Sequence, residues 1–113
     1  MSGIRSGQKA EQAAANYLES RRFQILETNW RTPWCEIDII ACKEGIVLFT
    51  EVKYRSDSLQ GTGFDYITPK KITQMGRAAE SWVQQNKWTG PYQLAAIEVE
   101  GPNYTIQHFI DNV

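Results

Sequence analysis

The chain has 113 residues, of which 42% are hydrophobic and 22% are charged, with a formal net charge of −1. This length fits one domain, residues 1–113, that buries roughly two-thirds of its unfolded surface without disulfides or metals. The apolar and aromatic content excludes a disordered chain, and no apolar run approaches the ~18 residues of a membrane span. The N-terminus lacks the apolar core of a signal peptide, so we expect a cytoplasmic protein.

The charges are unevenly distributed along the chain. Residues 1–87 carry a net charge of +2, and residues 88–113 carry −3. A near-neutral total is not typical of non-specific DNA binders, which have basic surfaces. Charge alone therefore leaves the partner open.

The two cysteines, Cys35 and Cys42, match neither a CxxC redox pair nor a zinc knuckle. In a reducing compartment such thiols are most often packing residues, which is the role we expect here.

The first predicted element is a helix over residues 7–20, for which Ser6 is a candidate N-cap. Its apolar side chains recur at the helical spacing i, i+3, i+4, i+7 and i+8. This stripe consists of Ala10, Ala13, Ala14, Tyr17 and Leu18. Residues 23–27 alternate weakly and predict a first strand, and residues 29–33 indicate a loop that ends in a proline.

A β-hairpin is predicted next. Residues 36–41 and 46–53 are rich in β-branched side chains, as strands are. Residues 42–45 connect them, and Gly45 can adopt the positive φ of a short hairpin turn. Residues 54–67 are polar and rich in Ser and Gly, and predict a mobile loop.

A second helix begins at Thr68-Pro69, with Thr68 as N-cap, and ends near residues 86–87. Its apolar stripe consists of Ile72, Met75, Ala79, Trp82 and Val83. Two strands, residues 92–99 and 103–110, complete the order α-β-β-β-α-β-β. Central strands that are apolar on both faces need a cover on each side, so we predict a three-layer α/β/α sandwich around a mixed sheet.

The main anomaly is a group of charged residues within the hairpin strands. Because side chains alternate along a strand, Glu36 and Asp38 share one face of the first strand, and Glu51 and Lys53 share one face of the second. A turn centred near residues 43–44 places Glu51 opposite Glu36, with Asp38 diagonal to Glu51. We therefore expect three carboxylates and a lysine within a few ångströms.

Such a cluster destabilises a fold unless a cation occupies it. Mg²⁺ commonly takes one or two protein carboxylates, so Asp38 and Glu51 are candidate ligands for Mg²⁺ or Mn²⁺. Lys53 can orient or help to deprotonate a metal-bound water, or neutralise charge that develops on a phosphate. Glu11 lies at the edge of the first helix's apolar stripe, where it can face the same end of the sheet.

Each of these residues also has an ordinary structural interpretation. Glu11 fits a solvated helix flank, and Glu51 with Lys53 fits an exposed ion pair at a strand end. A carboxylate inside Ile37-Asp38-Ile39-Ile40 that faces another carboxylate is harder to explain by packing, so we favour a metal site.

Other side chains are weaker candidates for nucleic-acid contact. Lys70 and Lys71 begin the second helix, whose N-terminus favours anions, although they also fit a solvated helix face. Trp30 and Trp34 could stack on bases or pack within the protein. His108 has no partner at a recognisable spacing, and we expect no catalytic role for it.

The hairpin residues resemble a known signature. Asp38, then twelve residues, then Glu51-Val52-Lys53 is similar to the D-xn-(D/E)-x-K pattern of the restriction-endonuclease-like PD-(D/E)XK nuclease superfamily, whose core order is α-β-β-β-α-β. More narrowly, the chain resembles the YraN-like family of small uncharacterised bacterial proteins, described as predicted endonucleases. The match consists of Gly7-Gln8-Lys9-Ala10-Glu11, Ala14, Tyr17-Leu18, Ile25-Leu26, Asn29, Arg31, Glu36-Ile37-Asp38-Ile39-Ile40-Ala41, Phe49, Glu51-Val52-Lys53, Arg55 and Lys70 or Lys71.

The resemblance implies a divalent-metal nuclease site. Asp38 and Glu51 would be the ligands, Lys53 the residue that positions water or stabilises charge, and Glu11 and Glu36 supporting acids. Archaeal Holliday-junction resolvases have a similar arrangement, which makes branched DNA a candidate substrate. The candidate nucleic-acid contacts are Arg31, Arg55, Lys70 and Lys71.

The sequence departs from the family pattern at two places. Cys35 stands where the family usually has Gly before Glu-Ile-Asp, and Gln93-Leu94-Ala95 stands where it usually has Arg-Phe-Asp. If that Arg binds phosphate in relatives, affinity or substrate differs in this chain.

The sequence therefore predicts a Mg²⁺- or Mn²⁺-dependent endonuclease, with DNA favoured over RNA as its substrate. The alternative is a non-catalytic module that retains the fold and binds nucleic acid or a protein partner. Whether the chain forms a homodimer is left open. Without the four acids assigned to the site, the chain carries a net charge of +3, which suits modest, metal-assisted affinity.

Overall fold

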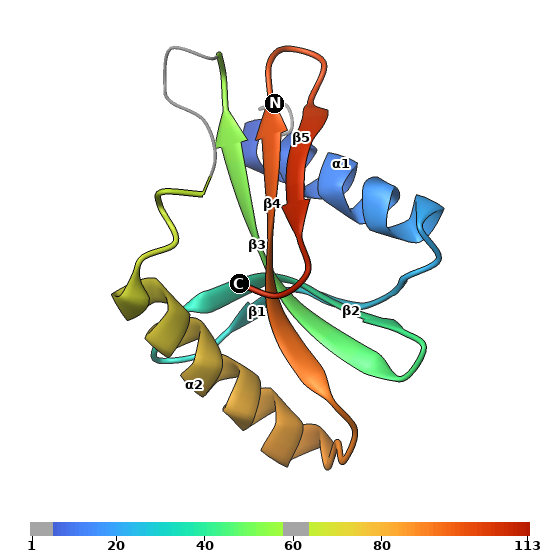
Figure 1. Cartoon of the computed structure of the whole chain (residues 1–113), viewed down its shortest axis with the longest axis vertical. Helices are drawn as coiled ribbons and strands as arrows, with labels where there is room; N and C mark the ends of the chain where they lie inside the picture. Colours follow the sequence, from blue (N-terminus) through green and yellow to red (C-terminus); the bar gives the residue numbers. More distant parts are fainter. Residues whose placement is uncertain (1–5, 58–63) are drawn as a thin grey trace, which may run out of the picture.

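A computed structural model describes residues 6–57 and 64–113, which form a five-stranded mixed sheet with a helix on each face (Figure 1). The strands follow chain order across the sheet, and only β3 and β4 are parallel. This confirms the predicted class and element order. The elements are α1 (Ser6–Ser20), β1 (Gln24–Arg31), β2 (Glu36–Lys43), β3 (Ile46–Arg55), α2 (Pro69–Asn86), β4 (Tyr92–Glu100) and β5 (Thr105–Ile110).

Two hydrophobic cores lie on opposite faces of the sheet, one under each helix (Figure 1). In each core the apolar stripe of one helix packs against apolar side chains of the strands, as predicted from the helical spacing of those residues. The α1-side core contains Ala10, Ala14, Leu18, Ile39, Ala41, Ile97 and Val99. The α2-side core contains Ile37, Ile40, Val47, Phe49, Met75, Ala78, Ala79 and Trp82.

The ends of α2 follow their sequence signals. The Thr68 hydroxyl accepts a hydrogen bond from the Lys71 N–H, Pro69 stands at the first helical position, and Lys87 ends the helix in the left-handed conformation. The predicted cap of α1 concerns the Ser6 side chain, which lies outside the described residues. Neither helix in the described ranges is long and apolar enough to cross a membrane.

The first strand is longer than predicted. Residues 29–31 continue β1, where Trp30 pairs with Ile37 and Arg31 with Glu36, so the predicted loop over 29–33 is wrong in its first half. Cross-strand pairing and the packing of Trp30 against the α2-side core outweigh the local polarity. A register shift between Ile25 and Glu27 accommodates this longer pairing.

The hairpin register also differs from the prediction. The turn consists of Glu44 and Gly45, both at positive φ (52° and 78°), as a two-residue hairpin turn requires. Consequently Ile40 pairs with Phe49 and Ile39 with Thr50, two positions away from the predicted alignment. The error arose because the turn lies one residue later than its assumed centre. β3 also continues to Arg55, into the predicted loop, of which residues 58–63 lie outside the described residues.

Substitutions at Gly45 and Gly76 test the positive φ assigned to the hairpin turn. A Cβ at either Gly45 or Gly76 would meet no atom within 4 Å, but only Gly45 has positive φ. We expect Gly45→Ala to lower the free energy of unfolding by about 1–2 kcal/mol. Gly76→Ala, inside α2, should raise it by about 0.5–1 kcal/mol. Urea unfolding measures both, and equal effects of the two substitutions would contradict the assigned turn.

Candidate functional site

Asp38 and Glu51 lie side by side where β2 and β3 stop pairing. The last paired residues are Ile39 and Thr50, so Asp38 and Glu51 are the next position along both strands. There the Asp38 Oδ2 accepts a hydrogen bond of 2.7 Å from the Val52 N–H. The Asp38 carboxylate thus takes the place of a backbone carbonyl as the acceptor for the Val52 N–H. The strand register therefore fixes the carboxyl groups of Asp38 and Glu51 opposite each other.

The regular alternation of side chains along β2 is interrupted at Asp38. Ile37 and Ile39 are two positions apart and would share a face in a regular strand. Ile37 instead packs in the α2-side core and Ile39 in the α1-side core. Asp38 is therefore held at a local distortion of the strand between two buried isoleucines.

The electrostatics of the pair are unfavourable without a cation. Burial raises the pKa of Asp38 to about 8, the Val52 N–H opposes this rise, and charge repulsion and hydrogen bonding by Glu51 add to it. Glu51 is compensated differently, because the Lys71 Nζ lies 3.2 Å from its Oε2. The raised pKa of Asp38 favours its protonated form, and the ammonium of Lys71 partly neutralises Glu51.

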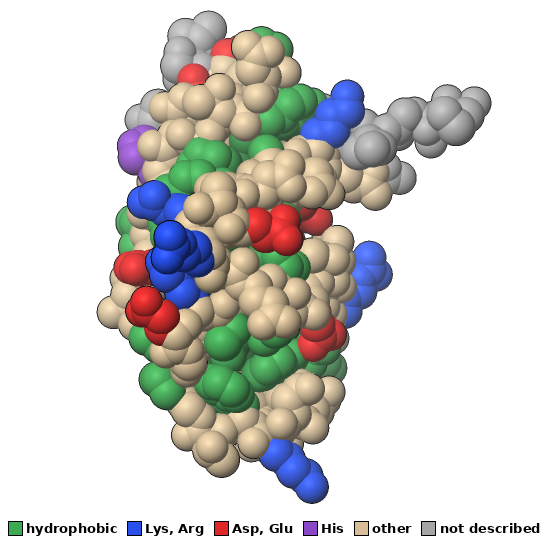
Figure 2. All heavy atoms as spheres, turned by 90° about the vertical axis from the view of Figure 1, so that its right-hand side faces the viewer, with side chains coloured by type: hydrophobic (Ala, Val, Ile, Leu, Met, Phe, Trp, Pro, Cys, Tyr) green, Lys and Arg blue, Asp and Glu red, His purple; other side chains and the backbone are tan. Residues whose placement is uncertain are grey.

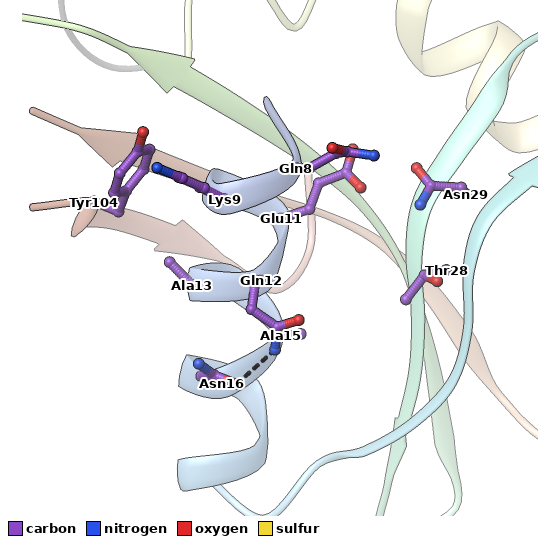
Figure 3. Close-up of a pocket in the computed structure, with 10 residues that line it drawn as sticks. All are labelled: Gln8, Lys9, Glu11, Gln12, Ala13, Ala15, Asn16, Thr28, Asn29 and Tyr104. Atoms are coloured by element: carbon purple, nitrogen blue, oxygen red, sulfur yellow. Dashed lines mark hydrogen bonds between the residues drawn. The ribbon is translucent and has the colours of Figure 1, made fainter. Parts of the chain in front are cut away.

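Glu11 approaches this pair from α1. Figure 3 shows its side chain extending toward Asn29 at the edge of a hollow of about 570 Å³. Burial raises the pKa of Glu11, a hydrogen bond with Asn29 opposes the rise, and the charges of Glu36 and Glu51 add to it. The β1–β2 register sets Asn29 opposite Asp38, so Asn29 links Glu11 to the site. We predicted a loop at Asn29 and gave it no role in the site.

Glu36 lies outside the compact pair. It faces solvent beside Arg31, with 3.8 Å between the Arg31 Nε and the Glu36 Oε2. In the described ranges no three His, Cys, Asp or Glu side chains are grouped closely enough to hold a metal ion. The predicted tight group of three carboxylates is therefore wrong. Two carboxylates meet, because the corrected hairpin register moves Glu51 from Glu36 to Asp38.

The predicted basic residues differ in their exposure and contacts. Lys53 is exposed two residues after Glu51, and its Nζ lies 5.8 Å from the ring centroid of Tyr66. Lys70 is exposed at the start of α2, whereas Lys71 turns toward Glu51. Arg31 is 84% exposed, so it can reach an external ligand.

The two cysteines are free and partly buried, and both pack against the α2-side core. Burial raises the pKa of Cys35, the charge of Lys71 opposes this rise, and the charges of Glu51 and Asp38 add to it. Cys35 thus packs at the border of the candidate site.

Arg55 is not available for the predicted contact with phosphate. Its side chain is 8% exposed, and its Nε lies 2.6 Å from the Oε2 of Glu98, which is completely buried. A second nitrogen lies 2.9 Å from the Asp65 carboxylate. The hydrogen bond to Glu98 is the main cause that raises the pKa of Arg55. Arg55 thus neutralises a buried acid, a role that its position next to the motif did not reveal.

His108 has a partner that its local sequence did not indicate. It pairs with Glu98 across β4 and β5, and its Nδ1 lies 2.7 Å from the Glu98 Oε1. Both oxygens of Glu98 are therefore bound. The two residues are ten positions apart, and only the antiparallel register brings them together.

The surrounding surface has mixed charge. Figure 2 shows acidic side chains in several separate places on the face on which α1 and the β2–β3 turn lie, with Lys and Arg side chains between them and at its edges. This distribution agrees with the net charge of −1. The basic residues do not form one continuous patch on this face.

The raised pKa of Asp38 predicts a pH dependence of stability. The folded protein keeps a proton that the unfolded chain releases near pH 4, so raising the pH from about 4 to 8 lowers the stability of the metal-free protein. Asp38→Asn should reduce this loss and raise the free energy of unfolding at pH 8 by about 1–3 kcal/mol. Urea unfolding with a chelator at pH 5 and pH 8 measures it. Asp111→Asn, at an exposed site, is the control, and identical pH profiles for wild type and Asp38→Asn would contradict the assignment.

The buried ion pair predicts a structural role for Arg55. Arg55→Ala leaves the Glu98 carboxylate buried with fewer partners, so the free energy of unfolding should fall by about 3 kcal/mol. Arg77→Ala, on the exposed side of α2, should change it by less than about 0.5 kcal/mol. Thermal unfolding of both variants measures the difference. An Arg55→Ala protein as stable as Arg77→Ala would show that the ion pair contributes nothing.

Comparison with known proteins identifies bacterial relatives. The family model described as "Uncharacterised protein family UPF0102" matches residues 10–99. A UPF0102 protein of Neisseria meningitidis is 37% identical over 98 residues, covering 86% of this chain and 85% of the relative. One from Shewanella frigidimarina is 35% identical over 103 residues, covering 89% and 95% respectively. One from Flavobacterium johnsoniae is 32% identical over 111 residues, covering 93% and 90%.

These similarities extend over most of each protein and include the whole candidate site. The range matched by the family model begins at Ala10 and ends at Val99, so it contains Glu11, Asp38 and Glu51. The chain therefore belongs to the uncharacterised protein family UPF0102, which is the YraN-like family that its sequence resembles.

Proposed function

We propose that this protein is a divalent-metal-dependent nuclease that hydrolyses phosphodiester bonds in nucleic acid. DNA, including branched DNA, is the favoured substrate over RNA. The observation that carries the proposal is the partly buried pair of Asp38 and Glu51, which lie at the end of the β2–β3 ladder with Lys71 3.2 Å from Glu51. Their mutual repulsion raises the pKa of Asp38. Two carboxyl groups held this way lower stability, and a cation-binding role explains the arrangement better than packing does.

The residues at this position fit Mg²⁺ or Mn²⁺. Asp38 and Glu51 offer only carboxylate oxygens, which hard divalent cations prefer. Mg²⁺ binds through one or two protein carboxylates and keeps several waters, so the lack of a third grouped acid in the described ranges is compatible with it. A bound divalent cation would supply Lewis-acid polarisation of the scissile phosphate. Glu11 and Glu36 would act from further away as supporting acids.

The lysines around the pair supply positive charge. The exposed ammonium of Lys53 lies on the strand that holds Glu51, where it can stabilise negative charge on the phosphate or orient the attacking water. Lys71 neutralises Glu51 in the metal-free protein and could turn toward a phosphate when another cation takes over that role.

The proposed nucleic-acid contacts are Lys70, Lys71 and Arg31. The lysines lie in the first turn of α2, where backbone N–H groups and the helix dipole also attract phosphate. Arg55 is withdrawn from this set because it is buried in ion pairs. We also propose a cytoplasmic location, and light scattering would establish whether the chain forms a homodimer.

The alternative is a non-catalytic module that retains the fold and binds nucleic acid or a protein. The ion pair between Lys71 and Glu51 favours this module, because the Lys71 ammonium already neutralises the carboxylate that a metal ion would bind. The two functions differ in metal binding, which a module of this kind does not need.

Metal binding and cleavage together test the proposal. Calorimetric titration should show Mn²⁺ binding to the wild type that Glu51→Ala weakens at least about tenfold, through loss of one of two carboxylates. Branched, flapped or single-stranded DNA should be cleaved with Mn²⁺, and Asp38→Ala or Lys53→Ala should lower the rate at least about 100-fold. Glu19→Ala, on the exposed face of α1, is the control. Cleavage that persists in both Asp38→Ala and Lys53→Ala would refute the nuclease assignment, and absence of Mn²⁺ binding would favour the module.

A further inference from the structure

The segment from Phe64 to Thr68 is fixed against the sheet beside the candidate site. The Asp65 carboxylate binds Arg55 at 2.9 Å, and the Phe64 ring lies 5.8 Å from the His108 ring. The Thr68 N–H donates to the Tyr66 carbonyl just before α2 begins. The first two contacts join the segment to β3 and to β5, and the Thr68 hydroxyl joins it to α2 by accepting a hydrogen bond from the Lys71 N–H. Tyr66 therefore has a defined position.

Tyr66 lies between the two cationic side chains that follow Glu51 on β3. The centroid of its ring is 5.8 Å from the Lys53 Nζ and 5.7 Å from the Arg55 Cζ. Both distances are within the range of cation–π attraction. The ring therefore helps to set the position of Lys53, the cation assigned to the phosphate.

The Tyr66 hydroxyl is the unexplained part of this arrangement. Its oxygen is buried and has no hydrogen-bond partner in the described part of the chain. A buried hydroxyl normally has a partner, because leaving one unpaired costs free energy. Burial raises the pKa of Tyr66, and the charges of Glu51, Glu98 and Asp38 also raise it, whereas that of Arg55 opposes the rise. The Tyr66 hydroxyl thus stays protonated and can donate a hydrogen bond. The negative charges of Asp38 and Glu51, the candidate metal ligands, favour this protonated form.

We propose that Tyr66 is a further substrate-binding residue of this site, whose hydroxyl donates a hydrogen bond to a phosphodiester oxygen held beside Asp38 and Glu51. The inference rests on the proposed nuclease function. A phosphodiester is the ligand class that fits, since its anionic oxygens accept hydrogen bonds and its charge suits Lys53 and Lys71. The hydroxyl, which has no partner among the described residues, would then gain one when substrate binds.

The substitution Tyr66→Phe removes the hydroxyl and keeps the ring over Lys53 and Arg55. Tyr92→Phe is the matched control, because Tyr92 is 39% exposed at the start of β4, where it pairs with Val47 at the far end of β3 from Glu51. Neither variant should lower the stability of the metal-free protein, since the Tyr66 hydroxyl has no partner to lose among residues 6–57 and 64–113. Chemical unfolding measures this first step.

The second step measures the phosphodiester directly. The probes are bis(p-nitrophenyl) phosphate hydrolysis with Mn²⁺, and calorimetric binding of a short single-stranded oligodeoxynucleotide with Ca²⁺. Tyr66→Phe should weaken oligonucleotide binding and lower kcat/KM by about 10- to 100-fold, as expected for the loss of a hydrogen bond to a charged oxygen. Mn²⁺ affinity should change less than twofold, because Tyr66 is not a metal ligand.

The outcomes separate this inference from the function on which it rests. If the wild type binds and cleaves but Tyr66→Phe equals Tyr92→Phe in both assays, the role of Tyr66 is refuted and the nuclease stands. If Tyr66→Phe loses stability in proportion to its loss of binding, the residue is structural and the inference is also refuted. If the wild type neither binds the oligonucleotide nor hydrolyses the ester, the nuclease assignment and the inference fail together.

Discussion

The candidate site depends on one constraint, which holds the carboxyl groups of Asp38 and Glu51 next to each other at the end of the β2–β3 ladder although they repel each other. The two-residue turn at Glu44 and Gly45 sets the register that brings them together. Because side chains alternate along a strand, a shift of one residue would turn Asp38 to the other face and separate the pair. The apolar packing of Ile37 and Ile39 on either side supports the strand against the repulsion.

The buried Glu98 and the partly buried Asp38 are stabilised in different ways. Glu98 is fully buried, but both of its oxygens are bound, by Arg55 and by His108, so it is a completed structural network. Asp38 receives one backbone N–H and faces another carboxylate, so it remains incompletely compensated. Satisfied buried networks specify a fold, whereas incompletely satisfied ones concentrate at functional sites. This contrast supports the proposed role of Asp38 in the candidate site.

Charge placement explains more than net charge does. The chain as a whole is nearly neutral, which at first argues against a polyanionic partner. The lysines of the proposed site are local, because Lys71 contacts Glu51 and Lys53 follows Glu51 by two residues on β3. A site of this kind needs little long-range attraction, since the metal and its adjacent lysines would supply the positive charge at the phosphate.

The sequence by itself determined the elements, the two helix stripes, the α/β class, and Asp38 and Glu51 as the central acids, because periodicity and turn chemistry are local properties. Only the tertiary structure decided which acids meet, how far β1 extends, and that Arg55 binds Glu98 instead of facing solvent. It also brought Asn29, His108 and Tyr66 to their partners. These contacts join residues from different elements, and they depend on strand register and packing, which no local pattern encodes.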